Sequence, residues 1–534
     1  MRISMTICNF AFALVCLFCA VHARRTIRRA EKDESPKSLR ALASFLRESA
    51  PEAGFQVGGA SHRPAVASGN QKRTRTVQCA DKRILVPEFP EVCDQTGLTL
   101  TRYMCEIARA NPDLQDLETL IASIQTACKT INSLVQRSHI TGLVGYAEGG
   151  GSINVQGEEQ KTLDVMTNDV LKRALRFTGK MGVIASEEED NPVDTTDDAG
   201  LASYDTRALM DETGRYTAVF DPLDGSSNVD AGIPTGTIFG IFEDNVECMV
   251  PEDGCDDAAQ ENDEECEINS PVTEECLKAT LQPGNSLVAS GYCLYSSSTF
   301  FCLTLGAGVN IFTLDPYIGE FVLTHKDVKV PERGAIYSMN EANRVAWDAP
   351  LRTYITDLQE GKGESGKKYS SRYIGSMVGD VHRTLLYGGL FGYPADSKNQ
   401  NGKLRLLYEA APMAYLVEQA GGLALTGKTR IMDLIPQNVH QRVPVILGSP
   451  DDVRECRKYY DIFTGSQTMD DSEEAKNIRA RCMTRLTPNQ LLDTTMDKQP
   501  DSIALDTTGD GTVDKVVKLA EAPPEALKAA GVKV

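Results

Sequence analysis

The feature that most constrains this chain is an apolar strand that runs directly into a pair of aspartates. Residues 216–220 read YTAVF and residues 221–225 read DPLDG, so a β-rich run delivers Asp221, a proline forces a turn, and Asp224 follows three residues later. The two carboxylates and the carbonyl of Leu223 can then share a hard cation, while the backbone N–H groups of residues 225–227 face an anion. The alternative interpretation is an ordinary Asp-Gly turn between two strands.

Two further acidic segments follow the same pattern. Residues 183–189 read VIASEEE, an apolar strand that ends in Glu187 and Glu188, and residues 403–409 read KLRLLYE, which places Glu409 just before a predicted helix. Taken singly, the first segment could be a solvated acidic loop and Glu409 could belong to a salt bridge. Carboxylates delivered by three separate strand or helix ends are what a phosphatase with several Mg²⁺ ions requires.

Composition places these motifs in an acidic globular protein. The 534 residues include 41% hydrophobic and 24% charged side chains, with a net charge of −20. This balance argues against a general nucleic-acid binder, a largely disordered chain or a polytopic membrane protein. A 3.6-residue apolar period over residues 117–135 predicts a long amphipathic helix, and β-rich runs at 216–220, 237–242, 309–314 and 443–447 alternate with helical stretches, so the class is α/β.

The two ends of the chain differ from its body. Residues 1–23 have the charged start, short apolar run and small-residue exit of a signal peptide, and residues 24–78 have the basic, Ser- and Ala-rich composition of a transit peptide or linker. Plain secretion with a basic spacer is the alternative. Residues 465–534 lack periodicity and are expected to form a loosely ordered extension, in which residues 506–517 resemble part of a Ca²⁺ loop but are better interpreted as a solvated acidic turn.

One internal segment combines acids with thiols. Residues 243–276 contain fourteen Asp or Glu, no Lys or Arg, and the cysteines Cys248, Cys255, Cys266 and Cys276. A segment with so little to bury is expected to be an exposed loop. Four cysteines allow three complete pairings, and four thiols without any control function are the simpler alternative.

The body of the chain resembles class I fructose-1,6-bisphosphatase. The resemblance runs from about residue 98 to residue 463, some two thirds of the chain, and is carried by FDPLDGSSN, YSMNEAN, RYIGSMVGDVHRTLLYGG, GKLRLLYEAAPMAYLVEQAGG and VILGSPDDV. It implies the layered α-β-α-β-α fold of sugar and inositol phosphatases, in two subdomains expected at residues 79–328 and 329–464, and a homotetramer. It also implies Mg²⁺-dependent hydrolysis of the 1-phosphate of fructose 1,6-bisphosphate to fructose 6-phosphate and phosphate.

The resemblance also assigns roles to individual residues. It implies two or three Mg²⁺ ions per subunit, held by Glu187, Glu188, Asp221, Asp224, Glu409 and the carbonyl of Leu223. It implies that Asp164 and Glu188 activate the attacking water, with Glu158 standing where the family has an Asp in a mobile loop. The implied substrate contacts are Gly225, Ser226 and Ser227 for the phosphate that leaves, Asn340, Tyr373 and Tyr393 for the 6-phosphate with Arg372 from a neighbouring subunit, and Lys403 and Arg405 for the sugar and its phosphates.

The acidic Cys segment falls where plastid members of this family carry a regulatory insertion. The resemblance implies a disulfide between Cys248 and either Cys266 or Cys276 that thioredoxin reduces to activate the enzyme. With the two-part leader, it implies a plastid stroma enzyme of the Calvin cycle or of gluconeogenesis, with no membrane attachment in the mature form. The rival functions are a sedoheptulose-1,7-bisphosphatase and a non-catalytic binding protein built on a phosphatase scaffold.

Overall fold

The computed structural model describes residues 87–143, 145, 161–189, 193–194, 215–243, 277–464, 472–486, 488, 490–492, 501–507 and 512–532. All of them belong to the second of two compact units, Lys82–Val534. The predicted signal and transit segments, Glu158 and the four cysteines of the acidic segment lie outside the described residues.

An eight-stranded sheet carries the first acidic segments. Its strand order is β2-β1-β3-β4-β5-β6-β7-β8, with β1 and β3 parallel and every other neighbouring pair antiparallel. The predicted strands at 216–220 and 237–242 are confirmed within β3 and β4, and the one at 309–314 is confirmed as β7, which begins one residue later. The bounds are β1 Met181–Ser186, β2 Val193–Asp194, β3 Tyr216–Asp224, β4 Thr235–Glu243, β5 Leu287–Tyr295, β6 Thr299–Thr304, β7 Asn310–Asp315 and β8 Glu320–His325.

Alternate side chains along the strands of this sheet pack into two separate apolar cores, one on each face. In β3, Ala218 and Phe220 pack into one apolar cluster with α3 (Leu100–Ala110), α4 (Gln115–Thr141) and α5 (Thr162–Arg176), whereas Val219 packs into the cluster on the opposite face. The amphipathic helix predicted from the 3.6-residue period is confirmed as α4, whose Leu117, Ile121 and Ile124 face the first cluster. Three helices therefore cover one face of the sheet.

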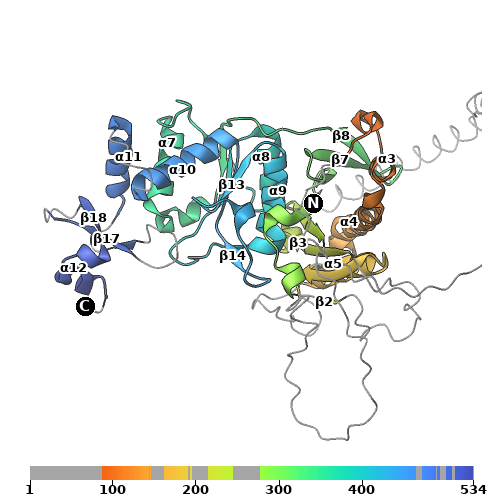
Figure 1. Cartoon of the computed structure of the whole chain (residues 1–534), viewed down its shortest axis with the longest axis horizontal. Coiled ribbons are helices and arrows are strands. Elements are labelled where there is room, and N and C mark those ends of the chain that lie inside the picture. The colour runs from red at the N-terminus through yellow and green to blue at the C-terminus, as the bar shows by residue number, and fades with distance from the viewer. Residues whose placement is uncertain are drawn as a thin grey trace, which may run out of the picture. The chain divides into compact units, whose positions relative to one another are not determined.

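A second sheet completes the layers. Its order is β10-β9-β11-β15-β13, with bounds β9 Ile336–Ser338, β10 Ser370–Ser371, β11 Leu390–Tyr393, β13 Leu423–Leu425 and β15 Val445–Gly448. Val445 and Leu447 pack against α8 (Met377–Tyr387) and α9 (Ala411–Gln419) in the cluster that also holds Val219, whereas Ile446 packs toward α7 (Ala349–Glu360) and α10 (Pro450–Thr464). Helices, sheet, helices, sheet and helices follow one another, so the predicted α-β-α-β-α fold is confirmed (Figure 1).

Short elements connect these layers. β12 (Leu404–Arg405) pairs antiparallel with β14 (Arg442–Val443), and the π-helical turn η7 (Leu406–Ala410) joins β12 to α9. The short 3₁₀ helices are η1 Glu91–Asp94, η2 Pro112–Leu114, η4 Ser226–Ala231, η5 Gly284–Ser286, η6 Glu341–Ala346, η8 Ile431–Asp433 and η9 Leu519–Glu521. Among the described residues, no helix has the length and apolar character needed to cross a membrane.

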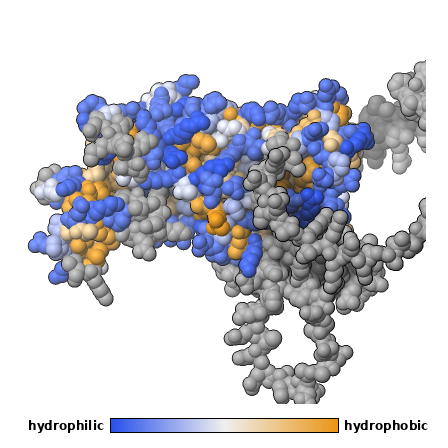
Figure 2. All heavy atoms as spheres, in the orientation of Figure 1, coloured by the Kyte–Doolittle hydropathy of each residue, from blue (hydrophilic) through white to orange (hydrophobic). Residues whose placement is uncertain are grey.

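The C-terminal residues differ from the expectation of a loosely ordered extension. Helix α11 (Glu473–Met483) packs Ala475, Ile478 and Cys482 into the same cluster as α7 and α10. It is followed by a three-stranded antiparallel sheet of β16 (Leu491–Leu492), β17 (Ser502–Leu505) and β18 (Lys515–Lys518), and by α12 (Pro524–Ala529). Figure 2 shows apolar side chains reaching the surface over β17, β18 and α12, where the core of Ile503, Leu505 and Val517 is small.

We expect Ile478→Ala to destabilise the protein. Ile478 is 2% exposed and packs from α11 into the cluster it shares with α7 and α10. Its truncation leaves a cavity that should cost about 2–4 kcal/mol of unfolding free energy. Urea denaturation followed by circular dichroism measures the change. Asn477→Ala, at the exposed neighbouring position of the same helix, is the control, and equal stability of the two variants would show that α11 does not pack on the fold.

Candidate active site

The end of β3 positions two buried carboxylates. Its pairing with β4 is irregular between Asp221 and Asp224, where the hydroxyl of Thr237 on β4 donates to the carbonyl of Pro222 at 2.8 Å. The backbone N–H of Leu223 donates to Asp221 Oδ1 at 2.9 Å. Gly225 then turns the chain into η4 with a φ of 75°, a left-handed conformation that favours glycine. The sheet therefore fixes both aspartates and the start of the Ser226-Ser227 turn.

A third carboxylate comes from the second acidic segment. Glu409 lies in the π-helical turn η7 and is 3% exposed. Its Oε2 accepts a hydrogen bond from the backbone N–H of Arg405 at 2.5 Å. Pro412 stands in the first turn of the following helix α9, as its sequence predicted, and the apolar face of α9 holds this segment against the sheets.

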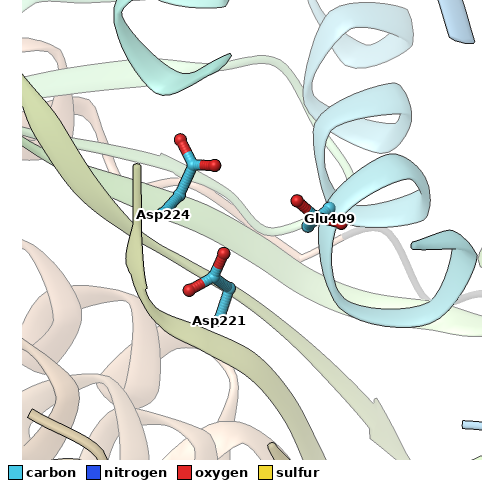
Figure 3. Close-up of side chains that lie close together, drawn as sticks. All are labelled: Asp221, Asp224 and Glu409. Carbon is cyan, nitrogen blue, oxygen red and sulfur yellow. The ribbon is translucent and has the colours of Figure 1, made fainter. Parts of the chain in front are cut away.

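The three carboxylates converge at one point. One oxygen from each of Asp221, Asp224 and Glu409 lies within 4.8 Å of the others, and Figure 3 shows the two strand aspartates and the helical glutamate turned toward one another. All three residues are buried. Hard divalent cations prefer several carboxylate oxygens, so this donor set fits a Mg²⁺-type ion.

Burial perturbs all three acids. It raises the pKa of Asp224 to about 7, although the N–H of Val378 and the cations Arg405 and Lys403 act in the opposite direction. It also raises the pKa of Glu409 to about 7, against the effect of Arg405. For Asp221, burial and then the neighbouring carboxylates hold the pKa well above its usual range. Without a bound cation, the fold thus disfavours full ionisation of the triad.

The other predicted ligands lie beside the triad. Glu187 and Glu188 follow β1 and line the same cleft, but Glu187 Oε1 lies 3.2 Å from a guanidinium nitrogen of Arg405. Arg405 is 4% exposed, and its other terminal nitrogen is 4.0 Å from Glu409 Oε2. This arginine therefore bridges the first and third acidic segments.

Asp164 lies at the start of α5. Its Oδ2 accepts from the backbone N–H of Lys161 at 2.9 Å in a capping box, and it is 6% exposed. Because this interaction orients the carboxylate at the helix end, Asp164 is held in the wall of the same cleft as Glu188.

A cleft of about 550 Å³ collects the predicted site residues. Burial raises the pKa of Tyr373 to about 12, so its hydroxyl remains a hydrogen-bond donor at neutral pH. Arg372 does not line the cleft, and its carbonyl accepts a hydrogen bond from Arg383. The predicted residues that line the cleft are Asp164, Glu187, Glu188, Asp221, Leu223, Asp224, Gly225, Ser226, Ser227, Asn340, Tyr373, Tyr393, Lys403, Arg405 and Glu409.

Two charged residues of the cleft were missed by the sequence analysis. Lys161 Nζ lies 2.7 Å from Asp230 and 3.5 Å from the carbonyl of Ser226, so it supports the turn that carries the serines. Asp380, fully buried near the start of α8, accepts from the N–H groups of Ile374 and Gly375 and thereby shapes the loop that holds Tyr373. The only feature of the sequence that could have pointed to Asp380 is its place as an acidic residue in the first turn of a helix.

Comparison with known proteins identifies the family to which this chain belongs. Residues 98–326 match the fructose-1,6-bisphosphatase N-terminal domain model, and residues 330–461 match the C-terminal domain model. The chloroplastic fructose-1,6-bisphosphatase of Spinacia oleracea is 51% identical over 361 residues, which cover 68% of this chain and 81% of that protein. The chain belongs to the fructose-1,6-bisphosphatase family.

Other members agree with this assignment. The chloroplastic enzyme of Oryza sativa subsp. indica is 50% identical over 361 residues, covering 68% of this chain and 82% of that protein. The crystal structure of Leishmania major fructose-1,6-bisphosphatase in holo form is 39% identical, with a TM-score of 0.57, and covers 69% of this chain and all of that one. The chain is therefore a fructose-1,6-bisphosphatase, a phosphoric monoester hydrolase of a metal-dependent family, and the non-catalytic alternative is set aside.

We expect Asp224→Asn to stabilise the metal-free protein at pH 8 while abolishing activity. The raised pKa means that ionisation of Asp224 opposes folding, so its cost is absent near pH 4, grows as the pH rises toward about 7, and is complete above it. Removing the charge should add about 4 kcal/mol of unfolding free energy at pH 8 and less than half of that at pH 5.

Thermal unfolding in excess chelator at both pH values provides the measurement. Asp169→Asn on the exposed side of α5 is the matched control and should show no such difference between the two pH values. A destabilised Asp224→Asn protein at pH 8 would contradict the electrostatic account of the triad.

Proposed function

We propose that this enzyme hydrolyses the 1-phosphate of fructose 1,6-bisphosphate with two or three Mg²⁺ ions per subunit, releasing fructose 6-phosphate and phosphate. The observation that carries this proposal is the buried triad of Asp221, Asp224 and Glu409 beside the Ser226-Ser227 turn. Glu187, Glu188 and the carbonyl of Leu223 would complete the ligand set. When bound, the cations would neutralise the phosphoryl oxygens and lower the pKa of the attacking water.

The protein side chains would position the reactants and hold the proton. The backbone N–H groups that follow Gly225 and the hydroxyls of Ser226 and Ser227 would cradle the phosphate that leaves. Asp164 and Glu188 would accept the proton of the attacking water, and Glu158 would join them when the site closes. Because phosphoryl transfer needs little covalent assistance, this placement supplies most of what the protein contributes.

Three neutral side chains would hold the distal phosphate. Asn340, Tyr373 and Tyr393 line the same cleft as the acids and offer neutral hydrogen-bond donors. Lys403 and Arg405 would add positive charge near the sugar. Arg372 is exposed and outside the cleft of its own chain, which is consistent with a role in the site of a neighbouring subunit in a homotetramer.

We further propose that the enzyme acts in the plastid stroma, in the Calvin cycle or in gluconeogenic carbohydrate metabolism. The chloroplastic relatives support a plastid location, and residues 1–23 and 24–78 would act as successive signal and transit segments. A disulfide of Cys248 with Cys266 or Cys276 would keep the enzyme inactive until thioredoxin reduces it. The body would comprise the subdomains 79–328 and 329–464.

We expect phosphate release from fructose 1,6-bisphosphate to require Mg²⁺ and to be lost with chelator. Asp221→Asn should lower kcat by about 100-fold or more because it removes a charge from the centre of the triad. Phosphate release on fructose 1,6-bisphosphate and on sedoheptulose 1,7-bisphosphate measures activity and selectivity together. Asp169→Asn should retain activity, and a preference for the seven-carbon substrate would overturn the proposed specificity.

We expect the oxidised protein to gain activity only after a delay, while a dithiol reduces the disulfide. The Cys248→Ser variant should be active at once, without this delay. Replacement of one partner prevents the disulfide from forming, so the variant should resemble the reduced enzyme. A time course of phosphate release after oxidation measures the delay. Cys105→Ser on α3, a thiol outside the acidic segment, should keep it. Wild-type activity that does not respond to dithiol would remove the regulatory proposal and leave the hydrolase unaffected.

A further inference from the structure

A histidine outside the cleft connects two of the acidic segments. His440 lies between η8 and β14, and the pairing of β12 with β14 brings this segment alongside the start of η7. The backbone N–H of Leu406 donates to the carbonyl of Gln441 at 2.7 Å, which extends the pairing by one step. The ring of His440 therefore lies next to Tyr408, the residue before Glu409.

Each ring nitrogen of His440 has a different partner. Nδ1 lies 2.9 Å from the hydroxyl oxygen of Tyr408, and Nε2 lies 3.0 Å from the carbonyl oxygen of Glu189. A carbonyl only accepts, so Nε2 carries the proton and donates, and in the neutral ring Nδ1 accepts from the Tyr408 hydroxyl. The two rings also meet edge to face, with centroids 5.8 Å apart. The histidine thus links the residue after Glu188 to the residue before Glu409.

Both ends of this link are held firmly. Tyr408 is fully buried in the π-helical turn. The carboxylate of Glu189 accepts a hydrogen bond from Asn168 at 2.8 Å and pairs with Lys172 on α5. Asn168 in turn accepts from the hydroxyl of Ser186 at 2.8 Å, at the end of β1. A short polar link between two anchored segments fixes the distance between them.

We propose that His440 is a positioning residue, which fastens the Glu187–Glu189 loop to the Tyr408–Glu409 turn and so sets the separation of the carboxylates that receive the metal. This inference rests on the proposed metal site. His440 does not line the cleft, so it acts through Tyr408 and Glu189 and not on the substrate. Like-charged groups move apart unless their supports prevent it, and supports of this kind contribute strongly to metal affinity.

Binding of Mn²⁺, measured by the loss of the free-ion electron paramagnetic resonance signal, tests the proposal on the full protein. We expect His440→Ala to bind Mn²⁺ about tenfold more weakly than wild type. His440→Gln, which keeps one donor and one acceptor, should recover most of the loss. Tyr408→Phe should weaken binding in the same direction, and the double variant His440→Ala with Tyr408→Phe should be little worse than His440→Ala alone because one link is removed twice.

Kinetics and a control variant separate positioning from folding. The KM for fructose 1,6-bisphosphate at saturating Mg²⁺ should stay unchanged in His440→Ala while the Mg²⁺ concentration for half-maximal activity rises. His325→Ala, at an exposed histidine on β8, should match wild type. Wild-type Mn²⁺ affinity in His440→Ala, or in Tyr408→Phe if His440→Ala does not fold, would overturn the proposal. Absence of Mn²⁺ binding by the wild-type protein would instead overturn the metal site on which it rests.

Discussion

The mutual repulsion of three buried carboxylates is the constraint around which this fold is arranged. Asp221 and Asp224 come from a strand end, and Glu409 comes from a π-helical turn. Neither the strand nor the turn can move without disrupting the apolar packing around it. Burial and proximity both oppose ionisation, as the raised pKa values record. The free energy that keeps them together comes from the apolar clusters on both faces of the large sheet. The same arrangement gives a cation a site that is already assembled.

The cations of the site serve two purposes at once. Arg405 is as buried as the acids, and it lies between Glu187 and Glu409. It therefore offsets some of the negative charge and also ties the first acidic segment to the third. Lys161 likewise supports the turn that carries Ser226 and Ser227, while its charge offsets that of Asp230. The buried acid Asp380 shapes the loop that holds Tyr373 in the cleft wall. The same basic side chains therefore both offset negative charge and hold the segments of the site in place.

Local patterns in the sequence predicted those parts of the site that depend on near neighbours in the chain. The apolar strand that carries Asp221, the turn at Gly225 and the helix that begins near Pro412 each follow from a few consecutive residues, and the structure has all three. The strand does not end at Asp221, however, but continues past Pro222 to Asp224. The link between Glu187 and Arg405, and the one between His440 and Glu189, join residues more than 200 positions apart. No periodicity encodes such contacts. Helix α11 was missed for another reason: its apolar positions Ala475, Ile478 and Cys482 have helical spacing, but they lie among many charged residues.

The C-terminal helix has a consequence for how subunits can meet. The family models end at residue 461, and α11 begins after that point, yet it shares a core with α7 and α10. The strip of those two helices that α11 covers is already buried within its own chain. A second subunit cannot contact that strip without displacing α11, so any assembly of this protein must be built from other faces of the molecule.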